Sequence, residues 1–201
     1  MIERLKMWLI WLRRCPNSRG FGIQSPSVYR FVRYVVNEHY PYYAYAELQR
    51  CYPNLGVVQR KLFLLYFRIS NAFQPSVWLD YQDTQHAEPS YAARTSYIEH
   101  GCRKTHMVPF QSLEEVQAVK RIDVARMCVD HQSQEIYEAL LARMSDTSLL
   151  IVEGIYQTKE SRQFWNMILQ DSRTGITLDL YYCGLVFLDH VRTKRNYLIN
   201  F

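Results

Sequence analysis

The feature that most constrains the fold of this chain is an alternation of short apolar runs with amphipathic helical patterns. The apolar runs at 76–81, 122–129 and 148–153 are short and nearly continuous, as is typical of parallel strands buried on both faces. Helical spacing of apolar residues recurs between and after them, at 88–100, 113–120 and 133–144, with a weaker strand pattern at 105–108. We therefore predict an α/β fold in which a mainly parallel sheet is covered by helices on both faces.

Both ends of the chain depart from this alternation. Residues 1–56 carry helical patterns and an aromatic segment at 39–46, which we expect to pack between helices. An apolar helix is expected at 57–73, before Pro75. The C-terminal part shows strand patterns without helices between them, at 176–181, 185–188 and 196–201. We expect a helical N-terminal extension over 1–56 and a Rossmann-like domain over 57–201, with an antiparallel hairpin at the sheet edge.

Three hydroxyl side chains mark expected helix starts. Ser25 precedes Pro26, which suits the first position of a helix. Ser133 and Thr158 stand at the start of two later helical patterns. Because a hydroxyl oxygen can accept a hydrogen bond from a free backbone N–H of the first turn, we expect all three to act as caps.

Charge and cysteine usage narrow the possible classes of protein. The net charge of +5 permits an anionic partner without requiring one, and no basic cluster is denser than 192–195, so nucleic acid is an unlikely partner. The five cysteines form no CxxC pair, which indicates neither a zinc site nor a disulfide framework. The apolar run near the N-terminus is too short to span a bilayer, and no other segment reaches membrane length. These features predict a cytoplasmic protein without a transmembrane segment.

Several segments resemble one known family. The chain reads GFGIQSPSVY at 20–29, YYAY at 42–45, LLIVEGIY at 149–156, TKE at 158–160 and TLDLYYCGLVF at 177–187. These segments resemble a bacterial group of class I S-adenosylmethionine (SAM)-dependent methyltransferases whose members typically read GHGIHSPF near the N-terminus. The resemblance implies a Rossmann-like methyltransferase fold and SAM as cofactor. The short stretch at 101–121 implies that some strands of the family are missing or stunted.

The segment expected to cradle the cofactor departs from the family. The resemblance implies an acidic residue followed by glycines, close to D/E-x-G-x-x-x-G, whereas this chain reads LDYQDTQH at 79–86. Asp80 keeps the acidic position, but Gln82 and His86 replace glycines, whose missing Cβ lets a backbone approach a ligand closely. The residues that the resemblance assigns to cofactor binding are Asp80, Gln82, Asp83, His86 and Asp130. We expect SAM binding to be weak or absent.

Two functions remain open on this basis. The first is a degenerate methyltransferase-like protein with a binding or scaffold role, whose partner is an unknown small molecule or protein. The alternative is an active SAM-dependent O-methyltransferase with an atypical, non-glycine cofactor loop. The segment from Gln82 to His86 favours the first.

Catalytic and metal-binding candidates follow the later strands. The segment CVDHQS at 128–133 resembles the family's FIDGNH, so Asp130 and His131 are the candidates for catalysis, with His131 as a general base. Asp130 and Glu153 are the candidates for a divalent cation, but two carboxylates without a third ligand do not predict a metal site. Since strand ends of a parallel sheet meet at one edge, we expect Asp80, Asp130 and Glu153 to cluster there.

The first helix carries an apolar face formed by Trp8, Leu9 and Leu12. Because exposing such side chains to water is unfavourable, we expect this face to contact protein, either its own domain or a second copy in a homodimer. A membrane-surface role is the alternative, since basic residues flank the strip, namely Arg4, Lys6, Arg13 and Arg14.

Overall fold

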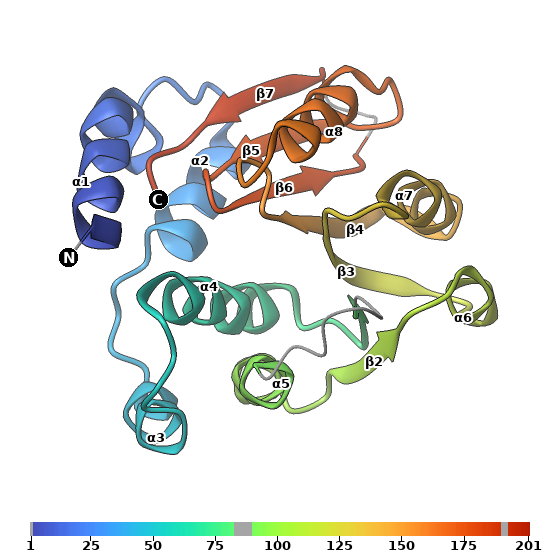
Figure 1. The fold of residues 1–201 in the computed structure, drawn as a ribbon, viewed down its shortest axis with the longest axis horizontal. Coiled ribbons are helices and arrows are strands. Elements are labelled where there is room, and N and C mark those ends of the chain that lie inside the picture. Colours follow the sequence, from blue (N-terminus) through green and yellow to red (C-terminus); the bar gives the residue numbers. More distant parts are fainter. Residues whose placement is uncertain (1, 83–89, 190–192) are drawn as a thin grey trace.

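The chain forms one seven-stranded sheet between two layers of helices (Figure 1), in a computed structural model that describes residues 2–82, 90–189 and 193–201. The strands lie in the order β2-β1-β3-β4-β6-β5-β7. Their bounds are β1 Val77–Tyr81, β2 His106–Phe110, β3 Ile122–Cys128, β4 Met144–Glu153, β5 Ile176–Asp179, β6 Cys183–Phe187 and β7 Arg195–Leu198. The predicted α/β class is confirmed, and β4 begins earlier than the expected 148.

Strand directions correct one expectation. Strands β2, β1, β3 and β4 run parallel, and β6 is antiparallel to both of its neighbours, β4 and β5. The predicted C-terminal antiparallel hairpin is confirmed as β5 and β6, but it does not form the edge, because the edge strand is β7, which pairs parallel with β5. The reason is the tight turn through Leu180–Tyr182, which folds β6 back between β5 and β4. There Gly184 is required, because a Cβ would lie 2.3 Å from the ring of Trp165 in α8.

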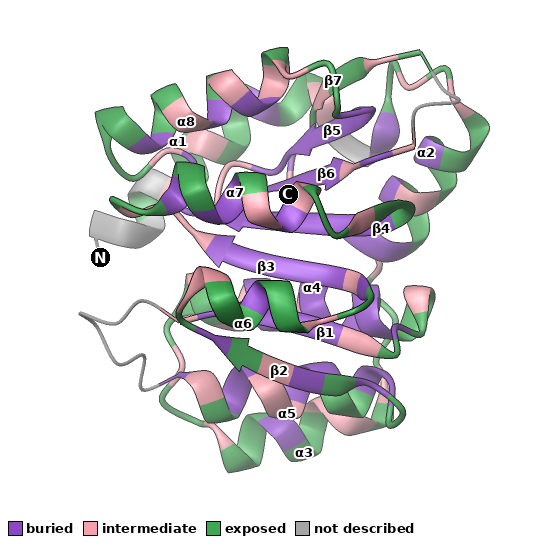
Figure 2. Ribbon diagram, turned by 90° about the vertical axis from the view of Figure 1, so that its right-hand side faces the viewer, coloured by how far each residue is buried: buried purple, intermediate pink, exposed green. Residues whose placement is uncertain are grey.

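The helices divide into two sets by the face that they cover. The first set comprises α2 (Pro26–Phe31), the π-helical turn η2 (Val32–Val36), α3 (Tyr43–Cys51), α4 (Val57–Phe73) and α5 (Tyr91–Gly101). The second comprises α6 (Leu113–Ala118), α7 (Ser133–Leu141) and α8 (Lys159–Gln170). Trp78 and Val124 pack with the first set, whereas Leu79 and Ala125 pack with the second. This alternation is the two-residue period of a strand, and it leaves the central strands buried (Figure 2).

Helix starts confirm one of the three expected caps. Thr158 caps α8 and accepts a 3.0 Å hydrogen bond from the backbone N–H of Ser161. Ser25 occupies the cap position of α2, but its side chain makes no capping hydrogen bond. Ser133 is the first residue inside α7, and Gln132 occupies the cap position. The Ser133 hydroxyl does not cap the helix, since it accepts a 2.6 Å hydrogen bond from the backbone N–H of Asp130, which precedes the helix.

The tyrosine-rich segment packs only in part. The rings of Tyr42 and Tyr45 each lie 5.0 Å from that of Phe67 in α4, which confirms the expected packing between helices for these two. Tyr43 is 97% exposed, because successive residues of α3 point in different directions, and Tyr40, which precedes the helix, is also exposed.

Helix α1 (Ile2–Arg14), which a 3₁₀ segment η1 (Cys15–Gly20) follows, is held to the C-terminal strands by Arg14. The guanidinium of Arg14 pairs with Asp179 at 2.8 Å and donates to the carbonyl of Ile199 at 3.3 Å. Trp8, Leu9 and Leu12 are between 41 and 55% exposed, so this face is only partly covered. Contact with a second copy stays a prediction. Among the helices described, none is long and apolar enough to cross a membrane.

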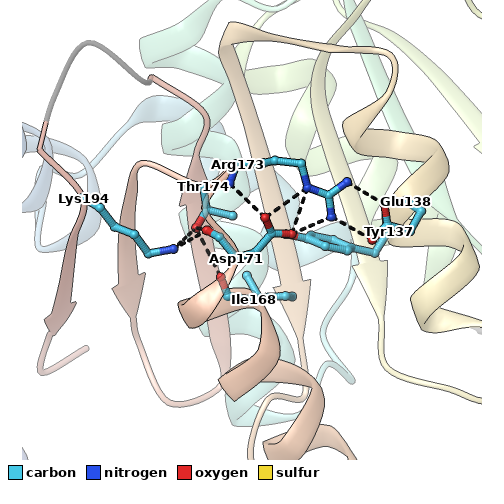
Figure 3. A network of polar contacts seen from close by, with 7 residues as sticks. All are labelled: Tyr137, Glu138, Ile168, Asp171, Arg173, Thr174 and Lys194. Atoms are coloured by element: carbon cyan, nitrogen blue, oxygen red, sulfur yellow. Dashed lines mark hydrogen bonds and ion pairs between the residues drawn. The ribbon is translucent and has the colours of Figure 1, made fainter.

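A polar cluster near the surface joins α7, the end of α8 and the segment before β7 (Figure 3). Arg173 pairs with Glu138 and Asp171, each at 2.6 Å, and Tyr137 donates to Asp171 at 3.0 Å. Lys194 donates to the Thr174 hydroxyl at 2.7 Å. Arg173 and Glu138 are each about half exposed, whereas the Asp171 side chain is only 9% exposed, so water reaches mainly the Arg173–Glu138 pair.

Candidate functional site

The carboxyl ends of β1, β3 and β4 hold a group of buried charges. An open parallel sheet usually binds its ligands at this edge. The sheet register makes Asp80 of β1 and Arg126 of β3 direct neighbours, and Glu153 ends β4 on the other side of Arg126. Arg94 reaches the same place from α5. We call these four residues the Asp80 network.

Asp80 is enclosed by two guanidinium groups. Arg94 donates to Oδ2 from Nε at 3.0 Å and from Nη2 at 2.7 Å, and Arg126 Nη1 lies 3.3 Å from Oδ1. The amide of Gln82 also donates to Oδ2. Asp80 and Arg94 are fully buried and Arg126 is 1% exposed. Burial raises the pKa of Asp80, and the guanidinium groups of Arg126 and Arg94 oppose this effect.

Glu153 completes the network. Arg126 holds its carboxylate with two parallel hydrogen bonds, from Nε to Oε1 at 2.8 Å and from Nη2 to Oε2 at 3.0 Å. The hydroxyl of Tyr66 in α4 also donates to Oε1. Burial opposes ionisation of Glu153, but Arg126 outweighs it and lowers the pKa of this carboxyl to about 2. Two carboxylates thus face two guanidinium groups, and the network is electrically balanced.

The structure brings two of the three clustered acids together. Asp80 and Glu153 meet through Arg126. Asp130 instead lies at the start of α7, where its Oδ1 accepts from the backbone N–H of Gln132 at 2.8 Å and from the Ser133 hydroxyl at 3.2 Å. Its Oδ2 is buried and has no hydrogen-bond partner in the described part of the chain.

The remaining candidates are placed more loosely. His131 is exposed, and no hydrogen bond joins it to Asp130 among the described residues. Gln82 belongs to the Asp80 network as a donor. Asp83 and His86 lie outside the described residues. Within the described ranges, no three His, Cys, Asp or Glu side chains come close enough to hold a metal ion.

Sequence reasoning missed the cationic half of the network. Arg126 stands inside the apolar strand IDVARMC, and a charge at such a position requires a buried opposite charge. This pattern could have predicted that Arg126 takes part in a buried ion pair. Arg94 and Tyr66 lie on helices with many polar or aromatic neighbours, and nothing in their spacing distinguishes them.

A small pocket lies beside Glu153. It has a volume of about 340 Å³, and α1 closes one side of it with Met7 and Ile10. Its other walls come from α4 and from the segments that follow β4 and β5, namely Val58, Leu62, Glu153, Gly154, Tyr156, Gln157, Tyr181 and Tyr182. We call it the tyrosine pocket. Aromatic walls with a few polar groups are typical of small-molecule sites.

The described residues do not fit a SAM cradle of the kind that the resemblance implies. Such a cradle needs a carboxylate at the end of the first strand that can contact the ligand. The Asp80 carboxylate is fully buried, and the guanidinium groups and Gln82 occupy both of its oxygens.

Comparisons with known proteins identify the fold. No protein-family profile and no curated protein matches the sequence. Among solved structures, a Staphylococcus aureus protein assigned as a caffeoyl-CoA O-methyltransferase is similar with a TM-score of 0.53 at 9% identity, over 72% of this chain and 91% of that one. MycE, a methyltransferase of the mycinamycin biosynthetic pathway in complex with Mg, SAH and mycinamycin VI, is similar with a TM-score of 0.56 at 9% identity, over 89% of this chain.

This chain spans 64% of the length of MycE. Identities this low show the fold alone. The chain has the Rossmann-like fold of class I SAM-dependent methyltransferases.

Proposed function

We propose that this chain is a methyltransferase-fold protein in which an internal ion-pair network has replaced the cofactor site, and that it acts by binding rather than by methyl transfer. The observation that carries the proposal is the enclosure of Asp80 by Arg94 and Arg126. A carboxylate in this position can serve a ligand only if its partners leave. Separating buried ion pairs costs several kcal/mol, because each charge then stands unpaired in the protein interior.

The residue at a former glycine position supports the same proposal. Gln82 donates its side-chain amide to Asp80, so the substitution adds a further partner to the network. The larger side chain also occupies volume where a glycine would leave room for a ligand. The pairing of Asp80 with two arginines and the larger side chain of Gln82 would thus both weaken cofactor binding.

The tyrosine pocket is the proposed binding site at this edge of the sheet. Its walls combine apolar side chains with the hydroxyl of Tyr156, which donates to Asp179 at 2.6 Å, and the stacked rings of Tyr156 and Tyr181, 5.1 Å apart. Stacked aromatic walls favour a flat, apolar ligand. The partner class is therefore a small molecule with an aromatic or similarly flat portion.

Calorimetric titration with SAM and with S-adenosylhomocysteine tests this function. We expect no saturable binding at micromolar concentrations for either compound. Micromolar affinity would overturn the proposal, and a titration of Tyr181→Ala would then show whether the compound occupies the tyrosine pocket. Thermal unfolding of the variant alone serves as the control for correct folding.

The active O-methyltransferase is the second candidate. The observation in its favour is that the tyrosine pocket lies at the strand edge where ligands of open α/β sheets bind, with Glu153 in its wall. If micromolar binding is found, release of S-adenosylhomocysteine in the presence of catechol-type acceptors distinguishes this candidate from simple binding.

A further inference from the structure

A second, larger pocket lies away from the Asp80 network. Its volume is about 770 Å³, and four parts of the chain line it: the end of α1, the segment 33–39 at the end of η2, helix α4 and the C-terminal residues 200–201. Arg33, Lys61 and Arg68 contribute positive charges to its walls. We call it the cationic pocket. It shares no lining residue with the tyrosine pocket, so an inference from it is independent of the cofactor question.

The positive charges of this pocket have no acidic partners among the residues that the structure describes. In the described ranges, none of Arg33, Lys61 and Arg68 forms an ion pair. Glu38 is the single Asp or Glu side chain in the described lining, and its Oε1 accepts 2.8 Å hydrogen bonds from the backbone N–H groups of His39 and Tyr40. The pocket therefore carries an excess of positive charge.

One of these cations, Arg68, is buried, and Lys61 is partly buried. Arg68 is 7% exposed and donates to the carbonyls of Val35 at 2.6 Å and Val36 at 3.1 Å, which stabilise part of its charge. The Lys61 amine lies 4.5 Å from the centre of the Phe201 ring. Burial, with a smaller contribution from Arg68, lowers the pKa of Lys61 to about 8. Since a buried cation normally has an opposite charge beside it, an anionic ligand is the missing component.

The apolar walls define the rest of such a ligand. Trp11, Leu64 and Phe201 line the pocket together with the cations. Guanidinium and ammonium groups bind phosphate oxygens with strong, charge-assisted hydrogen bonds. We propose that the cationic pocket binds an organic phosphate, with Arg33, Lys61 and Arg68 around the phosphate group and the three apolar side chains against its organic portion.

This chemistry has two sources. One is a free phosphate monoester. The other is the headgroup of an anionic phospholipid, because Trp11 is half exposed on α1, the helix that also presents Trp8, Leu9 and Leu12 to solvent. Tryptophan and leucine on a short amphipathic helix are typical of helices that lie in a membrane interface.

Titration with phenyl phosphate tests the pocket directly. The wild-type protein should bind with a saturable change in tryptophan fluorescence. The variants Lys61→Met and Arg33→Met should each weaken binding by roughly tenfold, since each loses one charge-assisted contact. Lys104→Met removes an exposed charge outside the pocket and should bind as the wild type does. Circular dichroism establishes that Lys61→Met folds, and Arg33 is exposed, so its variant is expected to fold in any case.

The outcomes separate the pocket from its alternatives. Absence of saturable binding at millimolar phenyl phosphate overturns the proposal, and so does equal binding by the wild type and both pocket variants. Co-sedimentation with phosphatidylcholine vesicles, with and without phosphatidylserine, then identifies the source. Pelleting that needs the anionic lipid and weakens in Lys61→Met assigns the headgroup, whereas phenyl phosphate binding without pelleting assigns a free monoester. Pelleting that is lost in Leu9→Glu but unchanged in Lys61→Met, without phenyl phosphate binding, assigns α1 alone and contradicts the pocket.

Discussion

Two regions of this molecule place arginine or lysine side chains in or near the interior, and they differ in whether those cations are paired with carboxylates. In the Asp80 network, Arg94 and Arg126 face two carboxylates and the interior is filled. In the cationic pocket, Lys61 and Arg68 line a cavity and form no ion pair within the described residues. The comparison teaches that a buried cation does not by itself mark a ligand site. What separates the two regions is the opposite charge beside the cation, and the proposed ligand site rests on the lack of an ion pair in the described residues.

The difference follows from how each region is assembled. Adjacent parallel strands place Asp80 and Arg126 at the same level of the sheet, so their side chains meet wherever the two strands pair. Lys61 and Arg68 are seven residues apart on α4 and therefore lie on one helix face, opposite segments that supply no ion-pair partner in the described residues. Strand register thus brings the arginine and carboxylate groups of the Asp80 network together. Helix packing leaves Lys61 and Arg68 without an ion-pair partner in the described residues.

The largest effect is expected from Arg126→Met. This change leaves Asp80 and Glu153 with buried, poorly compensated charges, so the free energy of unfolding should fall by about 3–5 kcal/mol. Urea unfolding followed by circular dichroism measures it. The matched control is Arg50→Met on α3, an exposed arginine whose loss should change little. A loss below about 1 kcal/mol for Arg126→Met would contradict the closed network.

Acid pH tests the same network through Glu153. Its pKa is about 2 in the folded protein against an ordinary 4.5, so the unfolded state takes up the proton first as pH falls. The stabilisation from Glu153 is full above about pH 4.5 and is lost as pH falls toward 2, up to about 3 kcal/mol at 1.4 kcal/mol per pKa unit. Glu153→Gln should be less stable at pH 7 and should lose less stability between pH 5 and 2. Exposed Glu47→Gln should follow the wild-type profile.

Arg14→Met should have an intermediate effect and bears on both regions, because α1 closes the tyrosine pocket and also lines the cationic pocket. The change removes the pair with Asp179 and the contact of the guanidinium with the Tyr181 ring at 5.2 Å. We expect a loss of about 2 kcal/mol, typical of charged hydrogen bonds, and faster hydrogen exchange within α1. Arg13→Met, at an exposed neighbouring position, should leave exchange unchanged.

The smallest effect is expected from Arg173→Met in the polar cluster of Figure 3. Arg173 and Glu138 are each about half exposed, and Asp171, which is 9% exposed, keeps its hydrogen bonds from Tyr137 and from the backbone N–H of residue 173. The loss in free energy of unfolding should be about 1 kcal/mol or less. If urea unfolding shows Arg173→Met to be as damaging as Arg126→Met, burial is not what distinguishes the two ion-pair groups.

The sequence determined the layers of this fold. Strands at β1, β3 and β4 and helices between them follow from apolar spacing, because each spacing fixes locally which side of an element can be buried. The cap at Thr158 was predictable for the same reason, since its partner Ser161 is three residues away. The acidic positions Asp80 and Glu153 at the strand ends were predictable from the expected sheet edge.

The tertiary structure alone decided how the charges pair and how the C-terminal strands are ordered. Arg126 bonds to Glu153, 27 residues away in the sequence, and to Asp80, 46 residues away. Arg14 bonds to Asp179, which is 165 residues away. The insertion of β6 between β4 and β5 likewise depends on which strand edges remain available once the sheet has formed. Apolar periodicity is a local property of a chain, whereas the partner of a buried charge is set by distant segments that only packing brings together.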